Sequence, residues 1–125
     1  MGGSTVAVLR WSDLPLEEPY PGIRRRRFDG HGFSAVLYHF APGAAFPLHS
    51  HPEEQLVVLL EGRVRLHQGG DRLLLAPGDA AWTPPGVPHA IEALEGPATL
   101  LNLVVPRRTR PLALHGEAPP ATPGA

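Results

Sequence analysis

The stretch GAAFPLHSHPEEQLVVLLEG, residues 43–62, decides the fold and sets two histidines close to a glutamine. Its second half, QLVVLL, is an apolar run of strand length that lies between a polar, proline-containing turn and a glycine. His49 and His51 lie two positions apart, so both rings leave the same face of an extended chain. Gln55 has the same parity and returns to that face if the strand resumes after the turn. The stretch therefore predicts two strands whose polar side chains meet on one face.

Short apolar runs recur along the rest of the chain, separated by turns drawn from its 16 prolines and 14 glycines. Each run is rich in valine, leucine or aromatic residues, and no long stretch keeps the 3.6-residue period of a helix. The sequence QGGD, residues 68–71, separates two alternating segments and predicts a hairpin. Many short strands favour an all-β sandwich or barrel, and periodicity does not choose between them. The runs are TVAVLRW, GFSAVLYHF, QLVVLL, RVRLH, RLLLA, AAWT, HAIEAL and ATLLNLVV.

Composition narrows the classes of function. A chain of 125 residues, 42% of them hydrophobic, suits one domain with a single core. The absence of cysteine excludes disulfides, thiolate metal sites and thiol nucleophiles. A formal net charge of -1 indicates no general attraction to nucleic acid or to an anionic membrane. No apolar run approaches ~18 residues, so we expect a cytoplasmic protein without a secretory signal or membrane span.

The two ends of the chain differ from its middle. Residues 1–22 include SDLPLEEPYPG and are predicted to form an arm with one short strand. Residues 23–106 contain most of the apolar runs and are predicted to form the globular domain. Residues 107–125 form a tail that ends in HGEAPPATPGA, which has almost nothing to bury. The end of this tail is therefore predicted to be disordered.

A third histidine completes a candidate metal site. In GDAAWTPPGVPHA, residues 78–90, His89 follows a Pro-Pro-Gly turn and begins another apolar strand. A single H-x-H pair is weak evidence, because surface histidines beside acidic residues are common. Three neutral imidazoles and one side-chain oxygen, in contrast, form a ligand set suited to a divalent first-row metal. We therefore take His49, His51, Gln55 and His89 as the candidate metal ligands.

Both stretches resemble motifs of a known family. Residues 43–62 resemble the first cupin motif, G-x5-H-x-H-x3-E-x6-G, with every spacing kept. Residues 78–93, GDAAWTPPGVPHAIEA, resemble the second motif, G-x5-P-x-G-x2-H-x3-N. The resemblance covers residues 43–93 directly, and flanking strands extend it from about 23 to 106. It implies a small single-domain cupin whose domain is a jelly-roll barrel, also called a double-stranded β-helix.

Two positions depart from the family pattern. Gln55 stands where the first motif has glutamate, and Ala93 stands where the second has asparagine, which is not a ligand in that pattern. The amide oxygen of Gln55 can still coordinate but adds no negative charge, which favours a stronger Lewis acid and an anionic oxygen ligand. Glu53 shares the parity of His51 and is the alternative fourth ligand. Only Gln55, however, stands seven residues before Gly62, where the motif places its carboxylate.

The resemblance implies a metal-dependent protein that acts on a small molecule, with zinc, nickel, iron or manganese as the possible metals. The sequence HSHPEEQ is similar to the site of pectin-degradation cupins, which linearise unsaturated uronates, and to that of cupin polyketide cyclases. We therefore expect a non-redox isomerase, lyase or cyclase whose metal acts as a Lewis acid on an oxygenated, carboxylate- or sugar-derived substrate. The alternatives are an Fe(II)-dependent dioxygenase and a non-catalytic cupin that binds or senses a small molecule.

The sequence does not identify a general acid or base, and the candidates for that role are Tyr38, His39 and Arg26. In RRRR, residues 24–27, alternate side chains share a face, so one of two alternate pairs could hold a substrate carboxylate. Solvated arginines on an edge strand are the simpler interpretation. PRRTRP, residues 106–111, follows the last long strand and is interpreted as a surface or oligomer contact.

The run QLVVLL also bears on assembly. Gln55, Val57 and Leu59 are predicted to face the interior, and the residues between them face outward. Both faces of this strand are apolar, so the outer face needs cover from an opposing sheet or a second subunit. Cupins of this size commonly pair, so the resemblance favours a homodimer.

Overall fold

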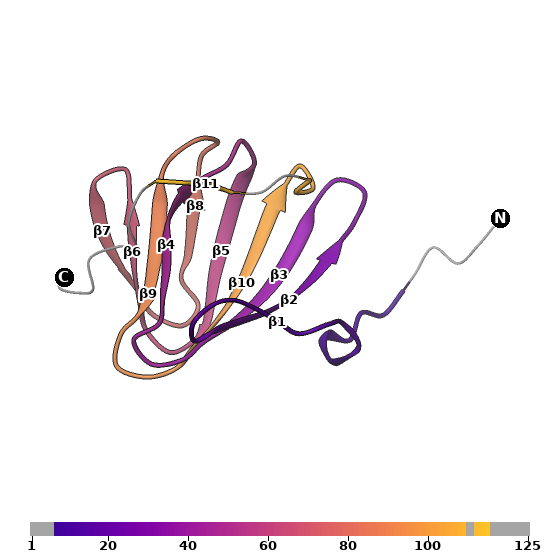
Figure 1. Ribbon diagram of the computed structural model, residues 1–125, viewed down its shortest axis with the longest axis horizontal. Coiled ribbons are helices and arrows are strands. Elements are labelled where there is room, and N and C mark those ends of the chain that lie inside the picture. The colour runs from indigo at the N-terminus through magenta and orange to yellow at the C-terminus, as the bar shows by residue number, and fades with distance from the viewer. Residues whose placement is uncertain (1–6, 110–111, 116–125) are drawn as a thin grey trace.

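Two antiparallel sheets pack face to face in the computed structural model, which describes residues 7–109 and 112–115 (Figure 1). The six-stranded sheet has the order β1-β2-β3-β10-β5-β8, and the five-stranded sheet has the order β11-β4-β9-β6-β7. The chain passes repeatedly from one sheet to the other, as in a jelly roll. The predicted all-β class and cupin jelly-roll barrel are confirmed. The elements are η1, a 3-10 helix (Trp11–Asp13), β1 (Glu17–Tyr20), β2 (Ile23–Asp29), β3 (Ser34–Phe40), β4 (Ala45–Ser50), β5 (Glu54–Glu61), β6 (Val64–Gln68), β7 (Asp71–Leu75), β8 (Ala80–Thr83), β9 (His89–Ala93), β10 (Ala98–Val105) and β11 (Ala113–Leu114).

Alternating side chains build the core between the sheets. Along β5, Gln55, Val57 and Leu59 are buried as predicted, whereas Leu56 and Leu60 on the other face are exposed. The predicted hairpin at QGGD is also confirmed, because β6 and β7 pair on either side of its two glycines. The core that results is continuous and draws on both sheets. Its fully buried large side chains include Ile23, Val36, Leu59, Val64, Leu66, Leu100 and Val104.

The ends of the chain differ in part from the sequence-based expectations. Residues 7–10 of the run TVAVLRW form no strand, and Val8 in that run is 74% exposed. The strand of the N-terminal arm is instead β1, which pairs with β2. Ala113–Leu114, within the predicted tail, forms β11 and pairs with β4, while residues 116–125 lie outside the described residues.

The described residues contain no helix of the length and apolarity needed to cross a bilayer. A cytoplasmic location stays a prediction.

Gly62, the last residue of the first motif, closes the turn between β5 and β6. Its φ is +88°, and an added Cβ would clash with the carbonyl oxygen of Pro97. We expect Gly62→Ala to lower the free energy of unfolding by at least about 2 kcal/mol, because the left-handed backbone and a clash with main chain both oppose the methyl group. Gly43→Ala is the matched control, since Gly43 has a φ of +76° but open space around it. Its expected loss is about 1 kcal/mol, the cost of the left-handed backbone alone. Equal losses in denaturant titrations would contradict the steric explanation.

On the outer face of β5, large apolar side chains are not covered by the described residues. Leu56 is 38% exposed, Leu60 is 45% exposed, and Trp82 on the neighbouring strand β8 is 57% exposed. A homodimer therefore stays the predicted assembly, because contiguous exposed apolar surface commonly marks an interface. Sedimentation analysis is expected to give twice the chain mass of 13.4 kDa. A monomer at micromolar concentration would contradict the prediction.

Candidate metal centre

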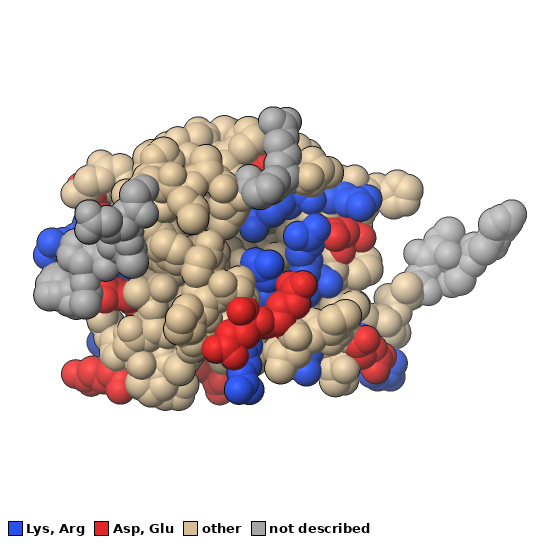
Figure 2. Space-filling model, viewed as in Figure 1, with Lys and Arg blue, Asp and Glu red and all other residues tan. Residues whose placement is uncertain are grey.

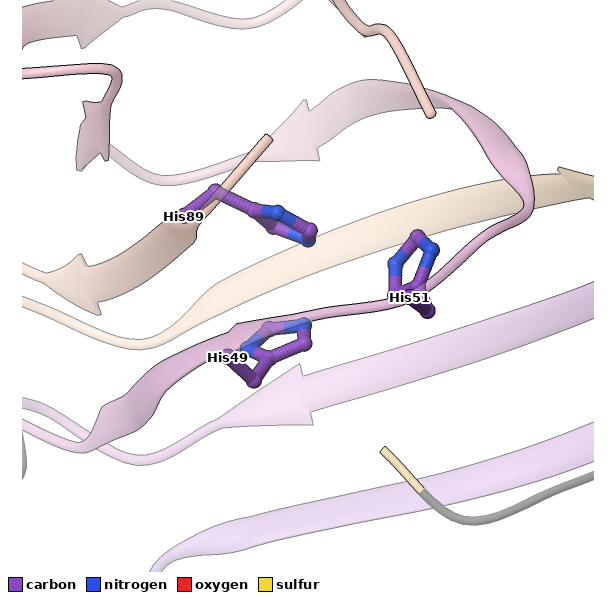
Figure 3. A group of neighbouring side chains, drawn as sticks. All are labelled: His49, His51 and His89. Carbon is purple, nitrogen blue, oxygen red and sulfur yellow. The ribbon is translucent and has the colours of Figure 1, made fainter. Parts of the chain in front are cut away.

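Two neighbouring strands of the five-stranded sheet bring three histidines together. His49 near the end of β4 pairs directly with His89, the first residue of β9, and His51 lies two positions after His49. Side chains at directly opposed positions of antiparallel strands are close neighbours. The ligand nitrogens of the three rings all lie within 4.8 Å of one another, and all three residues are buried. Figure 3 shows the rings turned toward one shared space.

Backbone carbonyls fix the orientation of every ring in the same way. In each case Nδ1 lies within hydrogen-bonding distance of a carbonyl oxygen two residues away: 2.7 Å for His49 and Pro47, 2.9 Å for His51 and Glu53, and 2.9 Å for His89 and Val87. A neutral imidazole that donates from Nδ1 keeps a lone pair on Nε2. This is the arrangement in which outer partners orient metal-binding histidines. Three Nε2 atoms are thereby available to a cation.

The residues present fit a divalent metal. The Nε2 atom of His89 is buried and has no hydrogen-bond partner among the described residues. A buried polar atom without a partner costs free energy, and a metal ion bound at this nitrogen would remove the cost.

Burial also lowers the pKa of His49, to about 3, and that of His89, to about 4. The pKa of His51 is lowered by burial and by the charge of Arg108. All three imidazoles are therefore neutral at neutral pH, the form that binds metals.

Gln55 reaches the histidines from the facing sheet. Its Oε1 atom lies 3.2 Å from Nε2 of His51, and the residue is buried on β5. Two ligand atoms that each bind one metal at about 2.1 Å lie roughly 3.0–3.4 Å apart, so this separation fits a shared ion. Glu53 lies at the other nitrogen of the same ring, with Oε1 3.5 Å from Nδ1 of His51. The geometry thus favours Gln55 over Glu53 as the fourth ligand.

A small cavity adjoins the three-histidine cluster. Its volume is about 30 Å³, and its polar lining includes His49, His89, Gln55, Asn102 and Arg108. The remaining walls are apolar or aromatic. A cavity of this size holds one or two waters or one functional group of a larger molecule. Chemistry at this site would therefore involve one small group that enters between the sheets.

Arg108 is a candidate functional residue that the sequence analysis missed. The segment PRRTRP predicts a surface or oligomer contact, yet Arg108 is only 8% exposed and lines the cavity beside the histidines. Its charge is close enough to lower the pKa of His51 and His89. The sequence offers no clear signal for this, because the inward course of the segment depends on the crossing from β10 to β11. A guanidinium in a cavity is well suited to bind a carboxylate.

A polar network holds the segment around Arg108 in place. The Arg108 backbone N–H donates to Oγ of Ser34 at 3.0 Å, and that hydroxyl donates to Asp29 at 2.6 Å. Burial alone would raise the pKa of Asp29, but the bonds from Ser34 and Arg27 lower it below its ordinary value. Arg27 donates from Nε to both carboxylate oxygens of Asp29, at 3.0 and 3.1 Å. These contacts fix the main chain from which the Arg108 side chain enters the cavity.

The three candidates for a general acid or base lie in different places. Tyr38 is buried and lines the cavity. His39 is exposed on β3, where its Nδ1 lies 3.4 Å from Oγ1 of Thr99. Arg26 donates from Nε to the carbonyl oxygen of Leu14 at 3.2 Å and does not line the cavity. Of the three, the structure brings only Tyr38 to the cavity.

A jelly roll with a polar site between its two sheets defines the class of protein, and the comparisons with known proteins identify the family. Residues 36–105, more than half of the chain, match the cupin domain. The chain belongs to the cupin family, which confirms the resemblance predicted from its two motifs.

Solved structures of similar length support the same conclusion. KdgF from a Halomonas species superposes with a TM-score of 0.77 at 27% identity, over 83% of this chain and 96% of that chain. An RmlC-like cupin from Shewanella frigidimarina has a TM-score of 0.76 at 24% identity, over 83% and 94% of the two chains, and shows the fold alone. The predicted similarity to small single-domain cupins is therefore confirmed.

Curated relatives are longer and match only in part. Quercetin 2,3-dioxygenase of Bacillus subtilis (strain 168) is 40% identical over 65 residues, which are 51% of this chain and 19% of that protein. Dimethylsulfoniopropionate lyase DddQ of Ruegeria pomeroyi is 31% identical over 77 residues, 61% of this chain and 38% of that protein. The chain thus spans less than half the length of either relative.

Proposed function

We propose that this cupin is a metal-dependent enzyme of non-redox type, an isomerase, lyase or cyclase. The observation that carries the proposal is the convergence of three buried histidines, each with Nδ1 held at a backbone carbonyl oxygen, beside a cavity that Arg108 also lines. His49, His51, His89 and Gln55 would bind one divalent ion, which is zinc, nickel, iron or manganese. When bound, such an ion supplies Lewis-acid catalysis at a carbonyl or hydroxyl oxygen.

The charge of the site favours an anionic substrate. The four proposed ligands are neutral, so they leave the charge of a dipositive ion uncompensated. Arg108 adds a further positive charge at the wall of the same cavity. A substrate carboxylate held by Arg108 would bring the adjoining carbon and oxygen atoms to the histidine cluster. A small carboxylate- or sugar-derived molecule is therefore the proposed substrate class.

Proton transfer requires a group at the cavity wall. Tyr38 is the proposed candidate because its side chain lines the cavity, and its cross-strand neighbour is Arg25. A phenol at the cavity wall can act as a proton donor or acceptor for a bound substrate. The apolar walls formed by Phe40, Val57 and Leu100 would exclude bulk water from this step.

An Fe(II)-dependent dioxygenase is the second candidate. The identity of 40% to part of a quercetin 2,3-dioxygenase favours it, whereas the similarity to part of a lyase favours the first candidate. The neutral Gln55 gives less support to oxidised iron than a carboxylate would, which weakens the dioxygenase interpretation. A cupin that only binds or senses a small molecule is the remaining, non-catalytic candidate.

Turnover assays under controlled oxygen test these alternatives. Metal-free protein would be reloaded with zinc, nickel, manganese or iron and screened against unsaturated uronates and other small hydroxy and keto acids. The proposal predicts turnover with a redox-inert metal in the absence of oxygen. Substrate-dependent oxygen uptake that requires iron would establish the dioxygenase instead. Thermal stabilisation by a ligand that is never converted would indicate a binding protein.

A further inference from the structure

A second hollow, which we call the arginine groove, adjoins the cavity at the histidine cluster. Its volume is about 470 Å³, and its lining includes Arg25, Arg27, Arg108, Tyr20 and Leu112. No acidic residue is among its described lining residues. Arg108 lines both the groove and the inner cavity. Figure 2 shows arginine side chains gathered in a hollowed part of the surface over β2, β3 and β10.

Strand alternation turns one pair of arginines toward this groove. Ile23 at the start of β2 is fully buried, and Arg25 and Arg27 have the same parity. The Arg25 side chain is 22% exposed, whereas that of Arg24 on the opposite face is 63% exposed. Of the two alternate pairs in RRRR, the structure therefore turns Arg25 and Arg27 to the side that faces the site.

The groove keeps cationic groups available to a ligand. Arg25 and Arg27 each use Nε for a carboxylate, that of Glu17 at 3.0 Å and that of Asp29 at 3.0 Å. Nη2 of Arg27 also donates to the carbonyl oxygen of Arg108 at 3.5 Å. A guanidinium has five N–H donors, so the remaining terminal N–H groups can bind another anion. Arg108 is 8% exposed, and its Nε has no hydrogen-bond partner among the described residues. A buried N–H group without a partner is unfavourable, so an anion at Nε of Arg108 would stabilise the site.

The two hollows differ greatly in size, which bears on how a substrate fits. The inner cavity of about 30 Å³ accepts one functional group, whereas the groove of about 470 Å³ has the size of an ordinary ligand site. The body of a substrate would therefore lie in the groove, with its reacting end toward the histidines. Arg108 stands where the two meet.

We infer that the arginine groove binds a second anionic group of the substrate, so that the substrate is a small dicarboxylate. One carboxylate binds Arg108 beside the histidine cluster, and the other binds between Arg25 and Arg27. This inference rests on the proposed function, in which Arg108 holds the first carboxylate.

Matched acids test the inference without knowledge of the substrate. Calorimetric titration of the full-length, metal-loaded protein would compare glutarate with pentanoate and adipate with hexanoate at low salt. We expect each dicarboxylate to bind about tenfold more tightly than the monocarboxylate of the same length, because it gains one charge-assisted contact. Arg25→Gln is expected to remove most of this preference. Arg24→Gln, on the outer face, is the matched control and should retain the preference.

The outcomes separate this inference from the proposed function. Equal affinities for the two kinds of acid in the wild-type protein would overturn the second subsite, and so would a preference that survives Arg25→Gln. Monocarboxylate binding that depends on Arg108 would still support the proposed function in either case. Should Arg25→Gln prove unstable, the wild-type preference would be measured against salt, where a charge contact in the groove predicts a decrease and a constant preference contradicts it.

Discussion

Replacement of His89 by alanine is expected to lower the affinity for a divalent metal more than about 100-fold. Loss of a residue that hydrogen-bonds to a metal ligand lowers metal affinity about 10–100-fold, and loss of a ligand itself lowers it further. His89 lies opposite His49 across β4 and β9, and its Nε2 is buried without a hydrogen-bond partner among the described residues. Competition titration with a chromophoric chelator would measure the change. Circular dichroism and thermal unfolding of the metal-free variant would show that the barrel is intact.

Two neighbouring residues supply controls for the histidine variant. Gln55→Glu keeps an oxygen ligand at the same position and is expected to retain the metal. Glu53→Gln is expected to weaken metal binding far less than His89→Ala, because Glu53 lies at Nδ1 of His51, away from the shared space. Metal loss in Glu53→Gln equal to that in His89→Ala would contradict the assignment of Gln55. Unchanged metal affinity in His89→Ala would contradict the site itself.

Replacement of Arg108 by glutamine is expected to weaken the binding of a monocarboxylate such as pentanoate by about 10- to 100-fold. Hydrogen bonds to charged groups contribute about 1.5–3 kcal/mol, and glutamine retains the polarity of the side chain without its charge. The metal-loaded protein would be titrated by calorimetry at constant ionic strength. Metal content is expected to stay unchanged, since Arg108 is not among the proposed ligands.

Arg107 provides the matched control for Arg108. It is the preceding residue and is exposed, whereas Arg108 is buried in the cavity wall. Arg107→Gln removes the same charge from the protein and is expected to leave pentanoate affinity within about twofold, because exposed charges are strongly screened. Equal effects of the two substitutions would show that only the overall charge matters, and would contradict a carboxylate site at Arg108.

The sequence predicted those features that depend on local pattern. The spacing of His49, His51 and Gln55 and the turn before His89 implied a shared site, and the structure brings these four residues together. Alternation along QLVVLL correctly predicted the buried and exposed faces of β5. The described part of the run TVAVLRW, residues 7–11, forms no strand, because apolar content alone does not provide a neighbouring strand with which to pair.

Features that depend on chain crossings were not predicted. The position of Arg108 follows from the return of the chain to β4 through β11, a pairing of two residues without a recognisable pattern. The choice between alternate arginines of RRRR likewise required the register of β2 against β3, in which Arg25 lies opposite Tyr38. Long-range pairings of this kind are set by packing of the whole barrel, so a local pattern does not reveal them.

X-ray absorption spectroscopy of the metal-loaded protein tests the central claim most directly. The account predicts one ion per chain with nitrogen and oxygen ligands at about 2.0–2.2 Å and the outer-shell scattering of three imidazoles. Spectra of the zinc-loaded and nickel-loaded proteins would show whether the same side chains bind both ions. A spectrum that contains fewer than three imidazoles, or a protein that binds no stoichiometric metal, would contradict the account.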